Sequence, residues 1–200
     1  MMDEYTIVWR NRFEGKYTVC AVGYRRAVYA VIKTGIKLAV GSVVYRSGGT
    51  FYFKKKAAGK AVFVRHGLGV GIDLSYDIKY IGGYSKDGRV VFLDRRFPKS
   101  HIFSSKKISL IESVARRHEV VEKWMIDDGF SYEHSHRVAT GVERRYVESR
   151  GVAWKEYDQW CRKEIRKITS MPLSRSPRSL DLTPYHDNIE ALSEIKRTFV

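Results

Sequence analysis

The sequence predicts an α+β protein, with a β-rich N-terminal half, then one strand and three helices, and finally a tail. Short runs rich in Val, Tyr, Phe and Thr, separated by Gly-containing breaks, fill residues 5–93. Apolar residues recur at helical spacing over 106–168. A polar, proline-containing stretch follows. We therefore divide the chain into a basic β-rich region at 1–88, a helical domain at 89–168, and a linker with a short terminal helix at 169–200.

The β-rich region contains the runs YTIVW, KYTVCAV, SVVYR, TFYFK and AVFVR. Residues 26–40 fit either a helix or strands. The Gly-rich segment 66–72 lacks the spacing of a phosphate-binding loop, so we interpret it as a turn or bulge. An Asp-Gly turn at 84–89 leads into a strand at 89–94, and Pro98 ends this part of the sheet because it has no N–H to donate.

Capping residues delimit the predicted helices. The first spans about 107–127 and stops before Gly129, a residue type that favours helix C-termini. Ser131 is a natural N-cap for the second helix, about 132–149, which Gly151 closes. A third helix covers about 154–168, the polar linker covers 169–187, and a short terminal helix covers about 188–198.

The net charge is +15, and it is unevenly distributed. Residues 1–90 contain 16 Lys and Arg against 6 Asp and Glu. Such an excess suits a nucleic acid, an anionic membrane surface or an acidic protein partner, although a solvated basic surface would give the same composition.

The two cysteines, Cys20 and Cys161, are far apart and form no C-x-x-C motif, which indicates a reducing compartment and no zinc ribbon. The first residues do not resemble a signal peptide. Residues 27–44 are apolar but contain Lys33 and Lys37, so we expect no integral membrane segment. We expect a cytoplasmic or virion-associated protein.

Five basic residues lie among aromatic ones and form a candidate nucleic-acid site: Lys54, Lys55, Lys56, Lys60 and Arg65. Cations can hold phosphates while neighbouring rings stack on bases. The alternative is a β-hairpin whose aromatic residues pack inward and whose KKKAAGK sequence is a solvated turn, and we favour this hairpin. The basic Ser/Arg stretch 174–179 is either a linker or a contact for polyanions.

The helix at 107–127 places His118 and Glu122 one turn apart, on the face that otherwise carries Ile and Val. On the next helix His136 and Glu143 lie two turns apart on one face. The short loop makes the two helices antiparallel neighbours. These four side chains can therefore meet and hold Zn²⁺ or another divalent transition metal. A hydrogen-bonded polar cluster that only fixes helix packing is the alternative.

Glu119 follows His118 directly, as in the zinc motif H-E-x-x-H, where the glutamate is the general base that activates water. Here Glu122 stands where that motif has its second histidine. Glu119 points about 100° away from His118 around an ideal helix.

The stretch 89–160 resembles small zincin-like domains of uncharacterised bacterial and phage proteins. The matching residues are Val91 to Pro98, His118-Glu119-x-x-Glu122, Ser135-His136-x-x-Ala139-Thr140-x-x-Glu143 and Gly151-Val152-x-Trp154-x-x-Tyr157. The resemblance implies a peptidase acting on a protein or peptide, with His118 as first zinc ligand, Glu119 as base, and His136 or Glu143 as third ligand. The chain departs from the full motif at Glu122.

Two hypotheses follow. In the first, the helical half holds a metal site that hydrolyses an amide bond, with Glu119 activating water. In the second, the chain is a non-enzymatic basic structural or nucleic-acid-binding protein of a phage or mobile element, and the His/Glu cluster only fixes helix packing.

Overall fold

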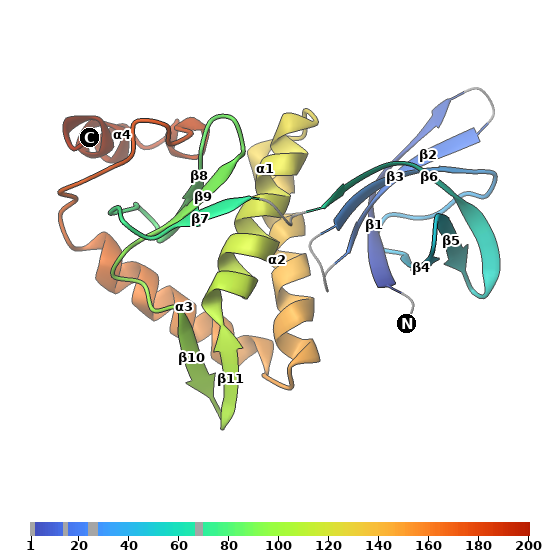
Figure 1. Ribbon diagram of the computed structural model, residues 1–200, viewed down its shortest axis with the longest axis horizontal. Helices are drawn as coiled ribbons and strands as arrows, with labels where there is room; N and C mark the ends of the chain where they lie inside the picture. Colours follow the sequence, from blue (N-terminus) through green and yellow to red (C-terminus); the bar gives the residue numbers. More distant parts are fainter. Residues whose placement is uncertain (1–2, 14–15, 24–27, 67–69) are drawn as a thin grey trace. The chain divides into compact units, whose positions relative to one another are not determined.

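The computed structural model describes residues 3–13, 16–23, 28–66 and 70–200. It confirms the α+β class, with a β-barrel and small sheets followed by helices (Figure 1). The chain forms two compact units, Met1–Leu68 and Gly69–Val200. The second unit thus includes strands that precede the boundary we drew at residue 89.

The first unit is a closed six-stranded barrel with the strand order β1-β2-β3-β6-β5-β4. Its strands are β1 Asp3–Phe13, β2 Lys16–Gly23, β3 Val28–Thr34, β4 Val43–Ser47, β5 Thr50–Phe53 and β6 Lys56–His66. Antiparallel pairing of Asp3–Thr6 of β1 with residues 43–46 of β4 closes the ring. Tyr5, Ile32 and Phe51 are fully buried in its core. The ambiguous segment 26–40 therefore contains a strand, β3.

Residues 50–66 form the predicted hairpin of β5 and β6. Lys54 and Lys55 occupy its turn with φ of 48° and 65°, the left-handed conformation that two-residue hairpin turns require. Lys56 and Lys60 lie on β6 with exposed side chains. The side chain of Arg65 lies outside the described part of the structure.

The second unit contains two small sheets and a set of helices. The strands are β7 Gly71–Asp73, β8 Gly82–Tyr84 and β9 Val90–Leu93 in one sheet, and β10 Ser100–Phe103 and β11 Lys106–Ser109 in the other. The helices are η1 Ile111–Glu119, α1 Val120–Asp127, α2 Tyr132–Ser149, α3 Trp154–Thr169, η2 Thr183–Tyr185 and α4 Ile189–Arg197. The central strand β9 corresponds to the predicted strand at 89–94.

Helix α2 has the predicted bounds, and the Ser131 side chain caps it by accepting from the His134 N–H. The helix before it differs from the prediction of 107–127. Residues 106–109 pair with β10 instead, and the helix begins at Ile111. Its first nine residues, η1, form a π-helix, which joins α1 where the Val120 N–H bonds to the Ala115 carbonyl five residues earlier. Local apolar spacing does not distinguish this wider helix from an α-helix.

The segment 169–187, which we predicted as a polar linker, packs into the second core. Leu173, Leu180 and Tyr185 are buried together with Ile78 of the sheet region and Ile195 of α4. The segment runs alongside the turn that follows Asp73 and alongside β8, and its backbone forms hydrogen bonds with the backbone there.

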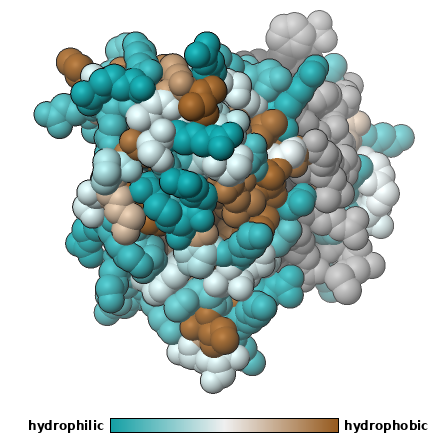
Figure 2. Space-filling model, turned by 60° about the vertical axis from the view of Figure 1, so that its left-hand side comes forward, coloured by the Kyte–Doolittle hydropathy of each residue, from teal (hydrophilic) through white to brown (hydrophobic). Residues whose placement is uncertain are grey.

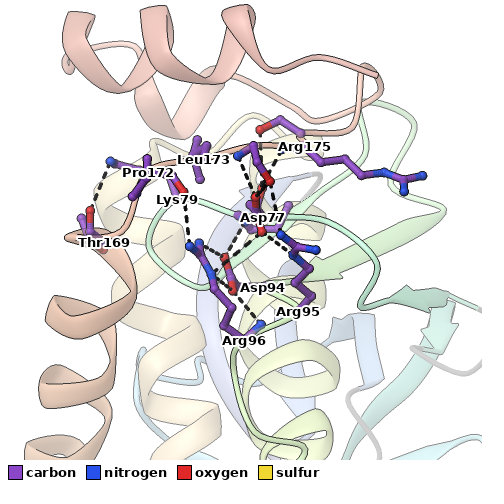
Figure 3. A network of polar contacts seen from close by, with 12 residues as sticks. Asp77, Lys79, Asp94, Arg95, Arg96, Thr169, Pro172, Leu173 and Arg175 are labelled. Carbon is purple, nitrogen blue, oxygen red and sulfur yellow. Dashed lines mark hydrogen bonds and ion pairs between the residues drawn. The ribbon is translucent and has the colours of Figure 1, made fainter.

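Buried carboxylates fix this segment to the sheet (Figure 3). Asp77 accepts hydrogen bonds from Arg95 Nε at 2.7 Å, from the Ser174 N–H at 2.7 Å and from the Arg175 N–H at 3.2 Å. Beside it, the buried Asp94 accepts from Arg96 Nη2 at 2.6 Å. Burial raises the pKa of Asp77, but the bonds from Ser174 and Arg95 outweigh it, so the pKa lies below its ordinary value.

No helix among the described residues is long and apolar enough to cross a membrane. The face of the molecule in Figure 2 is mostly hydrophilic, and its hydrophobic side chains form separate patches.

The Asp77 contacts predict a specific acid sensitivity. Asp77→Asn removes the charge that Arg95 needs, so we expect the free energy of unfolding at pH 7 to fall by about 1–3 kcal/mol. Because the folded-state pKa lies below 3.8, the stabilisation is complete above that pH and is lost as the pH falls through the folded value. The difference between wild type and variant should therefore shrink between urea titrations at pH 7 and pH 3.

Asp187→Asn is the matched control, since this carboxylate is fully exposed. It should unfold like wild type at both pH values. A difference for Asp77→Asn that stays constant or grows at pH 3 would contradict the assigned pKa direction.

Candidate metal centre

A cavity of about 380 Å³ lies in the second unit, and all the predicted metal and catalytic residues line it. Its walls come from η1, α1, α2 and α3, from the segment between β7 and β8, and from η2. The polar and aromatic lining residues are Tyr80, His118, Glu119, Glu122, Tyr132, His136, Thr140, Glu143, Trp154, Tyr157, Asp158, Cys161, Arg162 and Tyr185. The antiparallel arrangement of the two helices that the short loop predicted thus brings the four candidate ligands together.

Three ligand atoms converge inside this cavity. His118 Nε2 lies 3.1 Å from His136 Nδ1 and 3.6 Å from Glu122 Oε2, and His136 Nδ1 lies 2.8 Å from the same oxygen. One donor atom from each of these residues falls within a group that could hold a metal ion. We refer to His118, Glu122 and His136 as the triad.

Glu143 contacts the opposite side of the His118 ring. Its Oε2 lies 3.0 Å from Nδ1 of His118, and a carboxylate can only accept. Nδ1 therefore carries a proton and donates it, which directs the lone pair or second proton of Nε2 toward the triad. Glu143 thus orients a ring whose other nitrogen faces Glu122 and His136.

The charges of the triad are strongly coupled. Burial alone would lower the pKa of His118, but hydrogen bonds to Glu122 and Glu143 raise it well above its usual range. Burial would raise the pKa of Glu122, and the contacts with His118 and His136 instead lower it to about 2. The cluster therefore favours a positive charge between its carboxylates.

Tyrosine hydroxyls complete the polar contacts of the two carboxylates. Tyr84 on β8 donates to Glu122 Oε1 at 3.1 Å, and Tyr157 on α3 donates to Glu143 Oε1 at 2.6 Å. Tyr157 also lies 2.8 Å from Ser113 Oγ. Tyr157 belongs to the predicted third helix and Tyr84 to the predicted turn at 84–89. Their positions in the sequence did not indicate that either would be a carboxylate partner.

Glu119 lines the same cavity and is buried, although an ideal helix would turn it away from His118. Burial raises the pKa of Glu119 to about 8, and the negative charge of Glu122 adds to the effect. Glu119 packs against the backbone of Gly82, where an added Cβ would collide with its Oε1. Gly82 could not be predicted as part of the site, since a Gly-Gly pair indicates only a break between strands.

The turn that precedes Gly82 has a strained backbone and places Gly82 against Glu119. Tyr80 and Ile81 have φ of 63° and 74°, a region that is rare for side-chain-bearing residues and unusual for a β-branched one. Stacking of Tyr80 on Tyr185, at 5.9 Å between ring centroids, and burial of Ile81 hold the turn in place. Backbone strain of this kind concentrates at functional sites.

The other sequence candidates lie elsewhere. Lys54, Lys55, Lys56 and Lys60 belong to the barrel unit and not to the cavity lining. Cys161 lines the cavity, but burial raises the pKa of its thiol, which therefore stays protonated.

Comparison with known proteins adds no family to this description. No family model matches the chain, and no curated protein or solved structure matches it either.

The contact between Gly82 and Glu119 can be tested by substitution. Gly82→Ala places a methyl group against the Glu119 carboxylate, and we expect the free energy of unfolding to fall by about 1–3 kcal/mol because one group must shift. In a Glu119→Ala background this space is empty, so Gly82→Ala should lower the free energy of unfolding by clearly less. Urea titration of wild type, the two single variants and the double variant measures the coupling between the two positions.

Gly141→Ala is the control, because its Cβ would meet nothing within 4 Å. Gly141 is exposed within α2, and alanine there should stabilise the protein by about 0.5–1 kcal/mol. Equal losses for Gly82→Ala in both backgrounds would mean that Glu119 does not set the requirement for glycine.

Proposed function

We propose that the second unit binds a divalent transition metal, Zn²⁺ foremost, through the triad, and that the site hydrolyses an amide bond of a peptide or protein. The observation that carries the proposal is the convergence of two imidazole nitrogens and one carboxylate oxygen in one cavity wall. Imidazole and carboxylate are ligand types suited to zinc.

The spacing of the three atoms supports this ligand set. Bonds of about 2.05 Å to a tetrahedral zinc separate neighbouring ligand atoms by about 3.3 Å. The triad atoms are 2.8, 3.1 and 3.6 Å apart, so they can occupy one face of such a tetrahedron with small movements. Three protein ligands with a fourth position open to the cavity are typical of catalytic rather than structural zinc sites.

The surrounding contacts also match those of a metal site. Ligating histidines usually donate their second N–H to a carboxylate, which fixes the ring and its tautomer, and Glu143 has this place beside His118. We therefore assign Glu143 to the outer sphere and not to the ligand set. Tyr84 holds the second oxygen of Glu122 and leaves Oε2 for the metal.

A divalent ion at this position supplies Lewis acidity for hydrolysis. Glu119 is then the general base, because its carboxylate lies in the wall of the cavity that contains the triad and its backbone precedes α1 on the same continuous helix. The order of strand, metal-binding helix and second helix with a further ligand is the one that the resemblance to zincin-like domains implies. That resemblance, the peptide substrate and a cytoplasmic or virion location remain part of the proposal.

The alternative, a cluster that only fixes helix packing, differs in one respect. The hydrogen-bonded side chains of the triad can share protons among themselves without a cation. Such a cluster would stabilise the helices equally with and without added metal, so metal binding separates the two functions.

Metal content is the direct test of the site. We expect purified protein dialysed against Zn²⁺ to retain close to one equivalent, and His118→Ala, His136→Ala or Glu122→Gln to abolish this retention. Glu143→Gln should keep the ion but weaken its affinity by about 10–100-fold, because it removes an outer-sphere partner. Inductively coupled plasma mass spectrometry and competition with a chelating dye measure stoichiometry and affinity.

His134→Ala is the matched control, since His134 lies on α2 but is not a cavity-lining residue. It should bind zinc as wild type does. Less than about a tenth of an equivalent of any transition metal in wild type, unchanged in His118→Ala, would overturn the metal site.

The proposed role of Glu119 as general base is tested separately. Glu119→Gln preserves the size of the side chain and all triad atoms, so we expect zinc affinity to change little while hydrolysis of a quenched fluorescent peptide library falls by about 100-fold or more. Unchanged hydrolysis with zinc retained would remove Glu119 from the catalytic role and leave the metal site standing.

A further inference from the structure

The outer face of the barrel carries an unusual set of side chains. On β5 the buried Phe51 points inward, so Thr50 and Tyr52 on either side of it point outward. Strand register then fixes their neighbours. In one row across the strands, Lys60 pairs with Thr50 on one side and with Lys33 on the other. In the next row, Tyr45 pairs with Tyr52. We call Lys33, Tyr45, Tyr52 and Lys60 the tyrosine–lysine face.

The two lysines of this face are directly opposed. Like charges opposite each other on neighbouring strands destabilise a sheet. Both side chains are exposed, and among the described residues neither forms an ion pair with a carboxylate. The barrel thus keeps two cations together without a carboxylate partner among the described residues, which favours an anionic group supplied by a ligand.

The two tyrosines of this face are open to solvent, unlike those of the barrel core. Tyr45 is 40 % exposed and Tyr52 is half-buried, whereas Tyr5 is fully buried in the core. Phenol rings on the outside of a sheet next to paired lysines offer flat stacking surfaces beside cations. Glu4 pairs with Tyr45 at the far edge, so the positive potential lies toward β6 and β3.

The charge of the whole unit supports the same partner. Residues 1–68 contain 13 Lys and Arg against three Asp and Glu, a net charge of +10. We propose that the tyrosine–lysine face binds single-stranded nucleic acid, with Lys33 and Lys60 on the phosphates and Tyr45 and Tyr52 stacked on bases. This site is separate from the metal centre and does not depend on the proposed hydrolysis.

The combination of groups favours single strands over other polyanions. Rings can stack only on bases that are not already stacked in a duplex, and this stacking tolerates any sequence. An anionic membrane would also use the lysines, but interfacial binding needs apolar area to bury, and the tyrosine–lysine face consists of two lysines and two tyrosines. The hairpin turn adds Lys54, Lys55 and Lys56 to the positive potential of the same strands, β5 and β6.

Fluorescence anisotropy of the full chain with labelled 15-nucleotide oligothymidine tests the proposal. We expect salt-dependent binding, and in Lys33→Gln/Lys60→Gln a reduction of the log–log salt slope by about 1.4, since each phosphate contact on a single strand contributes about 0.7. Tyr45→Ala and Tyr52→Ala should each weaken binding by about 5–150-fold, as loss of one stacked base does, and leave the salt slope unchanged.

Lys106→Gln/Lys107→Gln is the charge-matched control, because it removes two exposed lysines from β11 in the other unit. It should bind as wild type does. The Lys33→Gln/Lys60→Gln variant should melt at or above the wild-type temperature, since repulsion is relieved, so its loss of binding cannot come from unfolding.

Four outcomes would overturn the inference: no binding at 50 mM salt, equal losses in the control and the test variant, equal affinity for duplex of the same length, or binding to phosphatidylserine vesicles without binding to oligothymidine. None of them would bear on zinc retention by the triad.

Discussion

The second unit is organised by the need to neutralise three carboxylates that share one buried wall. Glu119, Glu122 and Glu143 are all buried, and an unpaired charge in such a place is costly. Two histidines, two tyrosines and the tight backbone at Gly82 surround these groups. The packing of η1, α1, α2 and α3 against one another follows from these contacts as much as from apolar burial. A bound cation would complete the neutralisation.

Much of this arrangement could be predicted from local patterns. Helix α2 has the predicted bounds because Ser131 and Gly151 act at its ends, and the short loop at 128–131 makes it antiparallel to α1. Helical spacing then places His118, Glu122, His136 and Glu143 on facing surfaces. The different places of Glu122 and Glu143 around His118 could not be predicted, because they depend on which ring nitrogen of His118 faces Glu143.

Other features depend on contacts that no local pattern reveals. Closure of the barrel requires β1 to pair with β4, and the sequence shows only that both are strands. The π-helix η1 has a wider turn than the α-helix that apolar spacing predicts, and Glu119 at its end lines the cavity together with His118. The segment 169–187 has a linker's composition, yet Leu173, Leu180 and Tyr185 pack into the second core, and Asp77, far earlier in the chain, accepts the backbone N–H groups of Ser174 and Arg175.

That long-range attachment also sets an order of assembly during synthesis. All barrel pairings lie within residues 3–66, so the first unit can close while the rest of the chain is still being made. Asp77 must instead wait for Arg175, 98 residues later, which takes about 5–20 s at the usual rates of translation. During that interval Ile78 and Phe92 lack the later part of the core that covers them, so these apolar side chains are exposed until residues 173–195 have been made.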